Sequence, residues 1–214
     1  MKKTQRYFVL FVLGILFLGL SVVLLCFDKE TIHLAVNRWN GVGRDFFFYH
    51  LTFLGDGLFA LLVMIVAVFF RFRYAIALAI AYLSSALIVQ VLKHLVFSEI
   101  MRPVRYFRDT GIELHLVEGV SQHAYLSFPS GHSASALAVF VVLALLVKSR
   151  WIALTLLITG FAIAFSRVYL SQHFMADIFV GALIGCIAAY LSVLWMNLWE
   201  KPFMNHNILS IFKK

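Results

Sequence analysis

Charged residues are scarce in this sequence, and their scarcity excludes most soluble folds. Only 13% of the 214 residues are charged and 63% are hydrophobic, and the mean hydropathy is +0.94. An average soluble domain is about 25% charged and about 45–50% apolar, so a soluble fold could not bury this much apolar surface. Low-complexity stretches and Ser-, Pro- or Gly-rich linkers are lacking as well. We therefore expect a single domain, residues 1–214, that is embedded in a membrane.

Cysteine and acidic residues are also few. Cys26 and Cys186 both fall inside apolar runs, so the sequence indicates neither a disulfide framework nor a zinc site. The 18 Lys and Arg residues outnumber the 10 Asp and Glu residues and give a formal net charge of +8. Nucleic-acid binding requires basic residues gathered on one soluble face, but here they are spread between apolar runs, so we expect no nucleic-acid partner. Loops that lie next to anionic lipid explain the excess of Lys and Arg over Asp and Glu, so the lipid bilayer is the expected partner.

Long apolar runs are the main feature that is present. A helix needs roughly 20 mostly apolar residues to cross the hydrocarbon core of a membrane. The first run resembles a signal peptide, but it exceeds the usual apolar region and no A-x-A-like site follows it, so we expect an uncleaved span. The predicted fold is all-α, a polytopic bundle of six transmembrane helices near residues 8–27, 51–70, 74–92, 133–147, 151–170 and 178–199.

Basic residues between the runs predict how the bundle is oriented. The two chain ends and the short connections 71–73 and 148–150 hold ten Lys and Arg in about 27 residues, whereas the three other connections, counted together with Arg167 near the end of the fifth span, hold eight in about 73. The positive-inside rule therefore places both termini in the cytoplasm. We expect an integral protein of the bacterial inner (plasma) membrane with its long connections on the periplasmic side.

Polar residues gather at the helix ends that share this outer face. With both termini inside, the third and fifth spans end outside, and the fourth and sixth begin there. Arg and Lys at such a place suit an anion with several oxygens, such as a phosphate. The segment FPSGH starts a helix at the same face, where backbone N–H groups and the helix dipole favour an anion. The predicted site residues are Lys93, Arg102, Ser130, Gly131, His132, Arg167, His173 and Asp177.

His173 and Asp177 have the spacing of a nucleophile and the group that orients it. Residues four apart on a helix lie on the same face, one turn from each other. The carboxylate can hold one ring nitrogen of His173 and leave the other as a lone pair that attacks phosphorus. His132 is then free to donate a proton to the departing oxygen as general acid. Histidine has the near-neutral pKa that both roles need.

Two segments resemble signatures of the type 2 phosphatidic acid phosphatase family of lipid phosphatases and haloperoxidases. FPSGH (128–132) resembles the second signature, and SRVYLSQHFMAD (166–177) resembles the third. In that family P-S-G-H is followed downstream by S-R-x5-H-x3-D, and Ser166, Arg167, His173 and Asp177 fall at those spacings. The family's first signature is a lysine, six residues and Arg-Pro. Here eight residues separate the lysine, at position 93, from Arg-Pro, so its placement is open.

The resemblance implies an integral membrane lipid phosphatase that needs no metal or other cofactor. It implies a covalent phosphohistidine on His173 and His132 as the general acid. The implied phosphate cradle consists of Lys93, Arg102, Ser130, Gly131 and Arg167. The substrate is then a membrane lipid carrying a terminal phosphate. Bacterial members of the family suggest undecaprenyl diphosphate, lipid A or phosphatidylglycerol phosphate, and no residue of this chain separates these three.

Other interpretations of the same residues stay open. His132, His173 and Asp177 could instead ligate a metal, although the surrounding cations would repel a dication. The family resemblance also extends to vanadate-dependent haloperoxidases, for which a bundle of six spans is not required. A non-catalytic lipid-phosphate binder or transporter would need the cations but not the paired histidines.

Two features have no assigned role, and the sequence does not indicate the oligomeric state. Asp56, between two glycines, interrupts the second span near its outer end, where an intramembrane carboxylate is a functional candidate. Residues 28–50, which include an aromatic run at 46–49, could form an interfacial helix. His33 within this segment is expected to be a loop or interfacial residue.

Overall fold

The computed structural model describes residues 3–199 and 201–211, and helices are the only regular elements in these two ranges. The predicted all-α fold is confirmed. The α-helices are α1 (Lys3–Cys26), α2 (Lys29–Arg38), α3 (Val42–Leu51), α4 (Gly57–Phe70), α5 (Phe72–Val91), α6 (Pro103–Asp109), α7 (Gly131–Leu146), α8 (Arg150–Tyr169), α9 (Met175–Leu198) and α10 (Ile208–Ile211). Two 3₁₀ turns, Thr52–Gly55 and Pro202–Asn205, and a π-helical turn, Leu92–Val96, complete the list.

Four of these helices are long and apolar enough to cross a membrane. They are α1, α5 with its π-helical turn, α8 and α9. The pair formed by α3 with its 3₁₀ turn and α4 passes the same test as one broken span, which is bent by 56°. α7 is apolar but has only 16 residues. The bundle therefore has four or five candidate spans by length, and six spans stay a prediction that depends on α7.

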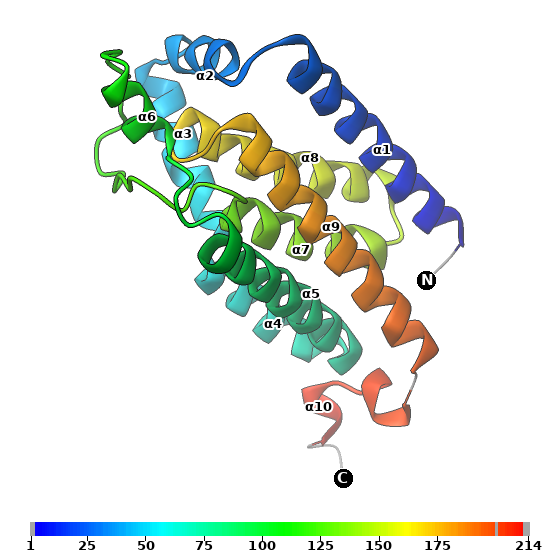
Figure 1. Cartoon of the computed structure of the whole chain (residues 1–214). Helices are drawn as coiled ribbons and strands as arrows, with labels where there is room; N and C mark the ends of the chain where they lie inside the picture. The colour runs from blue at the N-terminus through cyan, green and yellow to red at the C-terminus, as the bar shows by residue number, and fades with distance from the viewer. Residues whose placement is uncertain (1–2, 200, 212–214) are drawn as a thin grey trace.

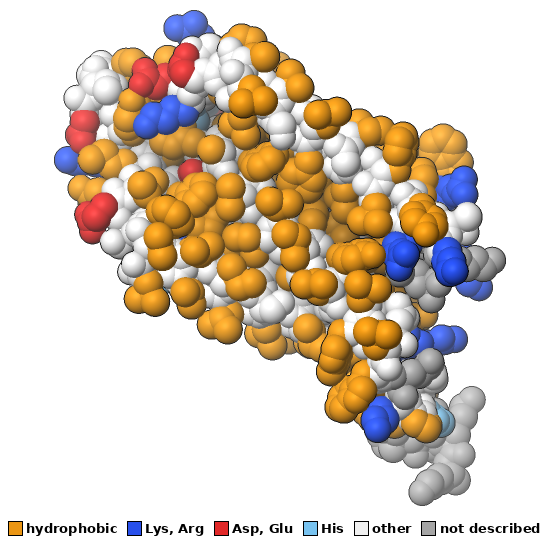
Figure 2. Space-filling model, turned by 45° about the vertical axis from the view of Figure 1, so that its right-hand side comes forward, with side chains coloured by type: hydrophobic (Ala, Val, Ile, Leu, Met, Phe, Trp, Pro, Cys, Tyr) orange, Lys and Arg blue, Asp and Glu red, His pale blue; other side chains and the backbone are white. Residues whose placement is uncertain are grey.

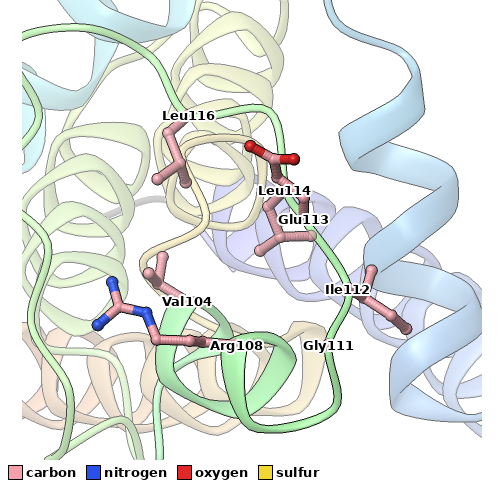
Figure 3. Close-up of a pocket in the computed structure, with 7 residues that line it drawn as sticks. All are labelled: Val104, Arg108, Gly111, Ile112, Glu113, Leu114 and Leu116. Atoms are coloured by element: carbon pink, nitrogen blue, oxygen red, sulfur yellow. The ribbon is translucent and has the colours of Figure 1, made fainter.

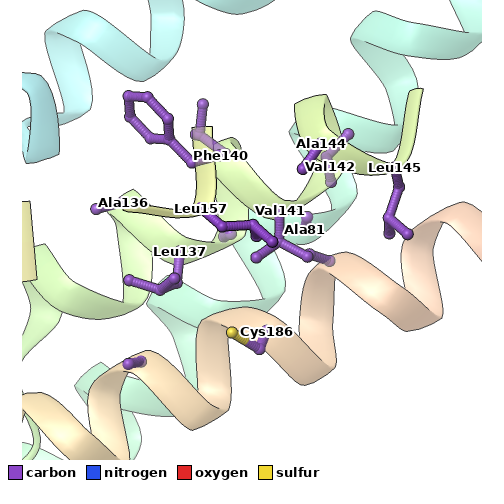
Figure 4. Close-up of a cluster of buried hydrophobic side chains, with 14 of the residues drawn as sticks. Ala81, Ala136, Leu137, Phe140, Val141, Val142, Ala144, Leu145, Leu157 and Cys186 are labelled. Atoms are coloured by element: carbon purple, nitrogen blue, oxygen red, sulfur yellow. The ribbon is translucent and has the colours of Figure 1, made fainter. Parts of the chain in front are cut away.

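The short helix α7 forms the centre of the molecule. Eleven of its 16 residues are buried, whereas only three of the 24 residues of α1 are. In Figure 4 the core side chains of α7 lie against Leu157 of α8 and Cys186 of α9. Because α7 is short and longer helices surround it, its polar N-terminus lies inside the molecule. The FPSGH segment (128–132) ends at this N-terminus.

Two glycines let α9 pack directly on the backbone of α7. A Cβ atom at Gly181 would lie 2.3 Å from the carbonyl oxygen of Ser130, and one at Gly185 would lie 2.3 Å from that of Ala134. Small residues four apart allow such close helix packing in membranes. Gly181 therefore fixes the start of α7 against the first turns of α9, where the chemical groups lie.

The two ends of the bundle differ. α2 and α6 lie at one end, and α1 begins and α10 lies at the other (Figure 1). Figure 2 shows a flank covered by hydrophobic side chains, and the Asp and Glu side chains that are coloured in this view lie at the end that carries α2 and α6. Lys and Arg also gather at the opposite end (Figure 2). The start of α1 and the short helix α10 thus lie away from the predicted site, and the compartment that each end of the bundle faces stays a prediction.

Candidate active site

The structure brings the predicted site residues to the end of the bundle that carries α2 and α6. Lys93 lies in the π-helical turn after α5, and Arg102 precedes α6. Arg167 lies in the last turn of α8, and Asp177 in the first turn of α9. The remaining four, Ser130, Gly131, His132 and His173, lie at the start of α7 and in the connection between α8 and α9.

His173 and Asp177 form a buried pair. The ring Nδ1 of His173 lies 3.4 Å from Oδ2 of Asp177, and the two residues are 1% and 4% exposed. The same Oδ2 accepts hydrogen bonds from the hydroxyl of Ser127 at 2.5 Å and from the backbone N–H of Phe174 at 2.9 Å. These donors fix the carboxylate, so the Nε2 of His173 is the ring nitrogen that faces away from it.

Burial keeps the imidazole of His173 neutral. It lowers the pKa of His173 to about 3, and the nearby Asp177 carboxylate offsets only part of this effect. Arg102 and Arg167 lower the pKa further by repelling a positive charge. A neutral imidazole whose Nδ1 faces a carboxylate carries its lone pair on Nε2, which is the state that a nucleophile requires.

Three buried cations lie near this pair without a carboxylate of their own. Lys93, Arg102 and Arg167 are each 8–9% exposed, and none forms an ion pair within the described ranges. The ammonium of Lys93 is close enough to both arginines and to Asp177 to interact electrostatically with each. Buried cations that lack a counter-ion are costly, so this arrangement favours the binding of an anion.

Hydrogen bonds hold part of each guanidinium group, and Arg167 keeps one donor atom without a partner among the described residues. Arg102 donates from Nε to the carbonyl oxygen of Tyr125 at 3.0 Å and from Nη1 to the backbone and side-chain oxygens of Gln172. Arg167 donates from Nη1 to the hydroxyl of Thr52 at 2.8 Å. The Nε of Arg167 is buried and has no partner among the described residues. An orphaned guanidinium donor of this kind fits an anion oxygen.

The start of α7 offers further donors. Ser130 caps the helix, because its hydroxyl accepts from the N–H of Ser133, and its own N–H donates to the backbone oxygen of Asp177 at 3.0 Å. That N–H is therefore already used and is not available to an anion. Within the described chain the N–H groups of Gly131 and His132 have no acceptor and remain available for an anion.

The irregular spacing between Lys93 and Arg102 coincides with irregular backbone. A π-helical turn accommodates an additional residue in a helix, and Lys93 lies in such a turn, Leu92–Val96. The turn leaves its side chain buried beside Arg102. The wider spacing therefore does not remove Lys93 from the cation cluster.

Asp56, which had no assigned role, is the partner of His132. Its Oδ1 lies 2.6 Å from the Nε2 of His132. The two glycines beside Asp56 permit the approach, since a Cβ at Gly55 would lie 2.9 Å from a methyl carbon of Ile163, and one at Gly57 would lie 2.6 Å from the hydroxyl of Tyr82. The break at 55–57 in an apolar run was the sequence signal for this residue.

The sequence-based expectation for His33 is wrong. His33 is a buried α2 residue, 1% exposed, and its Nε2 lies 3.2 Å from the hydroxyl of Ser171, two residues before His173. Asn37, one turn further along α2, pairs with the backbone N–H and carbonyl oxygen of His115. Helix α2 therefore packs on the loops around the site, and the spacing of four between His33 and Asn37 was the only signal for this.

The described residues do not assemble a metal-binding cluster. In the described chain no three His, Cys, Asp or Glu side chains come together to hold a metal ion, so the ligand set of the metal interpretation is not assembled.

A cavity of about 360 Å³ is lined by α6 and the loop after it, including Arg108 and Glu113 (Figure 3). None of the predicted site residues lines this cavity.

Comparison with known proteins identifies similar sequences and folds. Residues 74–201 match the profile of the PAP2 superfamily. The chain is 31% identical over 101 residues to the undecaprenyl-diphosphatase BcrC of Bacillus subtilis, which covers 47% of this chain and 51% of that protein. Across the curated relatives that it matches, the aligned segment spans 28% to 51% of their own length.

Two solved structures share the fold. LpxE of Aquifex aeolicus superimposes with a TM-score of 0.68 and 28% identity, over 77% of this chain and 94% of that one. A transmembrane PAP2-type phosphatidylglycerolphosphate phosphatase from Bacillus subtilis superimposes with a TM-score of 0.66 and 22% identity, over 92% and 99% of the two chains. The region that matches the PAP2 superfamily profile, residues 74–201, includes every predicted site residue.

Proposed function

Because this chain belongs to the PAP2 superfamily, we propose that it is an integral membrane lipid phosphatase that removes a terminal phosphate from a membrane lipid. The observation that carries the proposal is the cluster of three buried cations without counter-ions beside a neutral, carboxylate-held imidazole. Binding a lipid phosphate would need the cations alone. The paired histidines add a nucleophile and an acid, which a non-catalytic binder or transporter does not require.

The reaction has two steps. The Nε2 lone pair of His173 attacks phosphorus, the bond from phosphorus to the lipid oxygen breaks, and that oxygen takes a proton from His132. A water oxygen then attacks the phosphohistidine, the P–N bond electrons return to Nε2, and the proton of the water passes to His132. The net products are the dephosphorylated lipid and inorganic phosphate.

The cations and the start of α7 hold the phosphoryl oxygens during both steps. Negative charge spreads over these oxygens in the transition state, so fixed donors stabilise it. Arg102, Arg167 and Lys93 would supply charge, and the N–H groups of Gly131 and His132 would supply hydrogen bonds. Loss of one preorganised donor of this kind typically costs about 10²–10³ in rate.

The substrate reaches the site from within the membrane. Its acyl or prenyl chain stays in the bilayer while the phosphate enters the cluster at the end of the bundle. We place this end on the periplasmic side, with both termini cytoplasmic and α7 as the sixth membrane-inserted helix. The density of Lys and Arg at the opposite end supports this orientation.

A lipid panel in detergent tests the proposal. Phosphate release is measured from undecaprenyl diphosphate, lipid A and phosphatidylglycerol phosphate, in the presence of EDTA. We expect turnover of at least one lipid and no effect of the chelator. His173→Ala and Arg167→Ala should abolish turnover while the protein stays inserted, and His94→Ala, which changes an exposed histidine beside Lys93, should not.

The panel also separates the alternatives. A binder or transporter would retain lipid affinity and release no phosphate with any lipid. A haloperoxidase would need vanadate, peroxide and halide for activity. Activity that disappears with EDTA and returns with a divalent metal would contradict the proposed metal-free mechanism.

A further inference from the structure

The partner of His132 comes from a distant part of the chain. Asp56 lies 76 residues before His132, and the distance of 2.6 Å between Oδ1 and Nε2 is short for a hydrogen bond between these groups. The side chains are 34% and 38% exposed, so this pair is partly open to the outside. The segment that carries Asp56 is also tightly packed, because a Cβ atom at Gly55 would lie 2.9 Å from Ile163 and one at Gly57 would lie 2.6 Å from Tyr82.

Asp56 does not perform the role that its position usually provides. It stands at the N-cap of α4, where an aspartate normally accepts a hydrogen bond from the first helical turn and so stabilises the helix. Here its side chain makes no such bond. The carboxylate is directed to His132 instead, at the cost of the cap.

The electrostatic surroundings explain why His132 needs a carboxylate. The charged groups that act on its imidazole are Arg167, Lys93 and Asp56. Both cations repel a positive charge on the ring, and burial disfavours it as well. A general acid must nevertheless carry a proton before the lipid oxygen leaves. Asp56 is the one group among these three that favours the protonated ring.

We propose that Asp56 is a positioning residue that holds His132 as a protonated acid, with Nε2–H on the carboxylate and Nδ1–H directed to the leaving oxygen. This inference rests on the proposed phosphatase function and extends it to a residue outside the recognised motifs. As the lipid oxygen departs, the Nδ1–H proton moves to that oxygen and the ring becomes neutral. The Nε2–H bond to Asp56 persists, so the same ring can take the proton of the attacking water afterwards.

The dependence on the leaving group distinguishes this role from a purely structural one. The alkyl oxygen of a phosphomonoester lipid such as phosphatidylglycerol phosphate is a poor leaving group that needs a proton, whereas a nitrophenolate leaves without one. We expect Asp56→Asn to lower kcat on such a phosphomonoester lipid about 10²-fold, within the range for general acid catalysis. On p-nitrophenyl phosphate the same variant should lose less than about threefold. The alkaline limb of the lipid pH profile should move to lower pH, because less base is needed to remove the proton from the ring.

Two controls make the result decisive. Asp109→Asn removes a carboxylate that is 41% exposed and pairs with Arg105, and it should leave the activity on both substrates unchanged. In a His132→Gln background, Asp56→Asn should add no further loss, because residues that act as one unit are not additive. Thermal unfolding in detergent confirms that each variant is folded.

The possible outcomes separate the two proposals. If Asp56→Asn is folded and loses activity equally on the lipid and on p-nitrophenyl phosphate, the positioning role is overturned and the phosphatase function stays intact. The same conclusion follows if the folded variant loses activity on neither substrate. A loss that persists in the His132→Gln background also overturns it. A wild-type protein that releases no phosphate from any lipid contradicts both proposals.

Discussion

The two histidines of the proposed site, His173 and His132, each face a carboxylate in a different setting. His173 and Asp177 are almost completely buried, and three donors hold the carboxylate. His132 and Asp56 are partly exposed, and their side chains meet at 2.6 Å. Burial keeps the first ring neutral and in one orientation, which suits a nucleophile. Partial exposure lets the second ring exchange protons with the outside, which suits an acid that acts as a base in the next step.

The largest effect should come from breaking the buried pair. Asp177→Asn keeps the size of the side chain but removes the charge that selects the Nε2 lone pair of His173. We expect kcat on the lipid substrate to fall by about 10⁴, as for the corresponding change in a catalytic triad. The measurement is steady-state phosphate release at saturating lipid, with Asp109→Asn as the matched change of an exposed carboxylate. Activity within tenfold of the wild type would contradict the assigned role of Asp177.

A smaller loss of kcat should follow from moving the His132–Asp56 pair relative to the His173–Asp177 pair. Gly181→Ala places a Cβ atom 2.3 Å from the carbonyl oxygen of Ser130, so the start of α7, which carries His132, must shift from α9. A displacement of about 1 Å can cost about 10²-fold in rate, and we expect a loss of that size in kcat. Gly14→Ala, where no atom lies within 4 Å of the new Cβ, is the control and should leave kcat unchanged. Equal activity of both variants would show that the close α7–α9 packing does not position the site.

Weakening one donor of the buried pair should have a modest effect. Ser127→Ala removes the hydroxyl that donates to Oδ2 of Asp177 at 2.5 Å and leaves the His173 and Phe174 contacts in place. A hydrogen bond to a charged group contributes about 1.5–3 kcal/mol, part of which the remaining donors retain. We expect a roughly tenfold loss in kcat with little change in KM. A change confined to KM would assign Ser127 to substrate binding instead.

The two pairs also differ in how far the sequence could predict them. His173 and Asp177 are neighbours on one helical turn, so their spacing alone indicated the pair. His132 and Asp56 meet only because the chain bends at two glycines and the short helix α7 is surrounded by longer ones. The same long-range packing explains why the buried position of His33 was not expected, and why α7 makes the number of spans uncertain from length alone. The motif residues, the all-α fold and the shared end of the bundle followed from local patterns.

His33 extends the comparison to a histidine that has no carboxylate partner. Its Nε2 contacts the hydroxyl of Ser171, and its Nδ1 is buried without a partner in the described chain. Burial lowers the pKa of His33 from 6.5 to about 4. The unfolded chain therefore binds a proton first as the pH falls, so the stability that the neutral ring contributes is complete above pH 6.5 and is lost towards pH 4.

Replacing this ring should change the pH dependence of stability more than it changes turnover. His33→Gln removes the titration, so the variant should lose less stability than the wild type between pH 6.5 and 4. The difference should be on the order of 1–3 kcal/mol, measured by thermal unfolding in detergent. His94→Gln, at an exposed histidine, should follow the wild-type curve. If His33→Gln and the wild type lose stability in parallel, the ring of His33 is not buried as a neutral group.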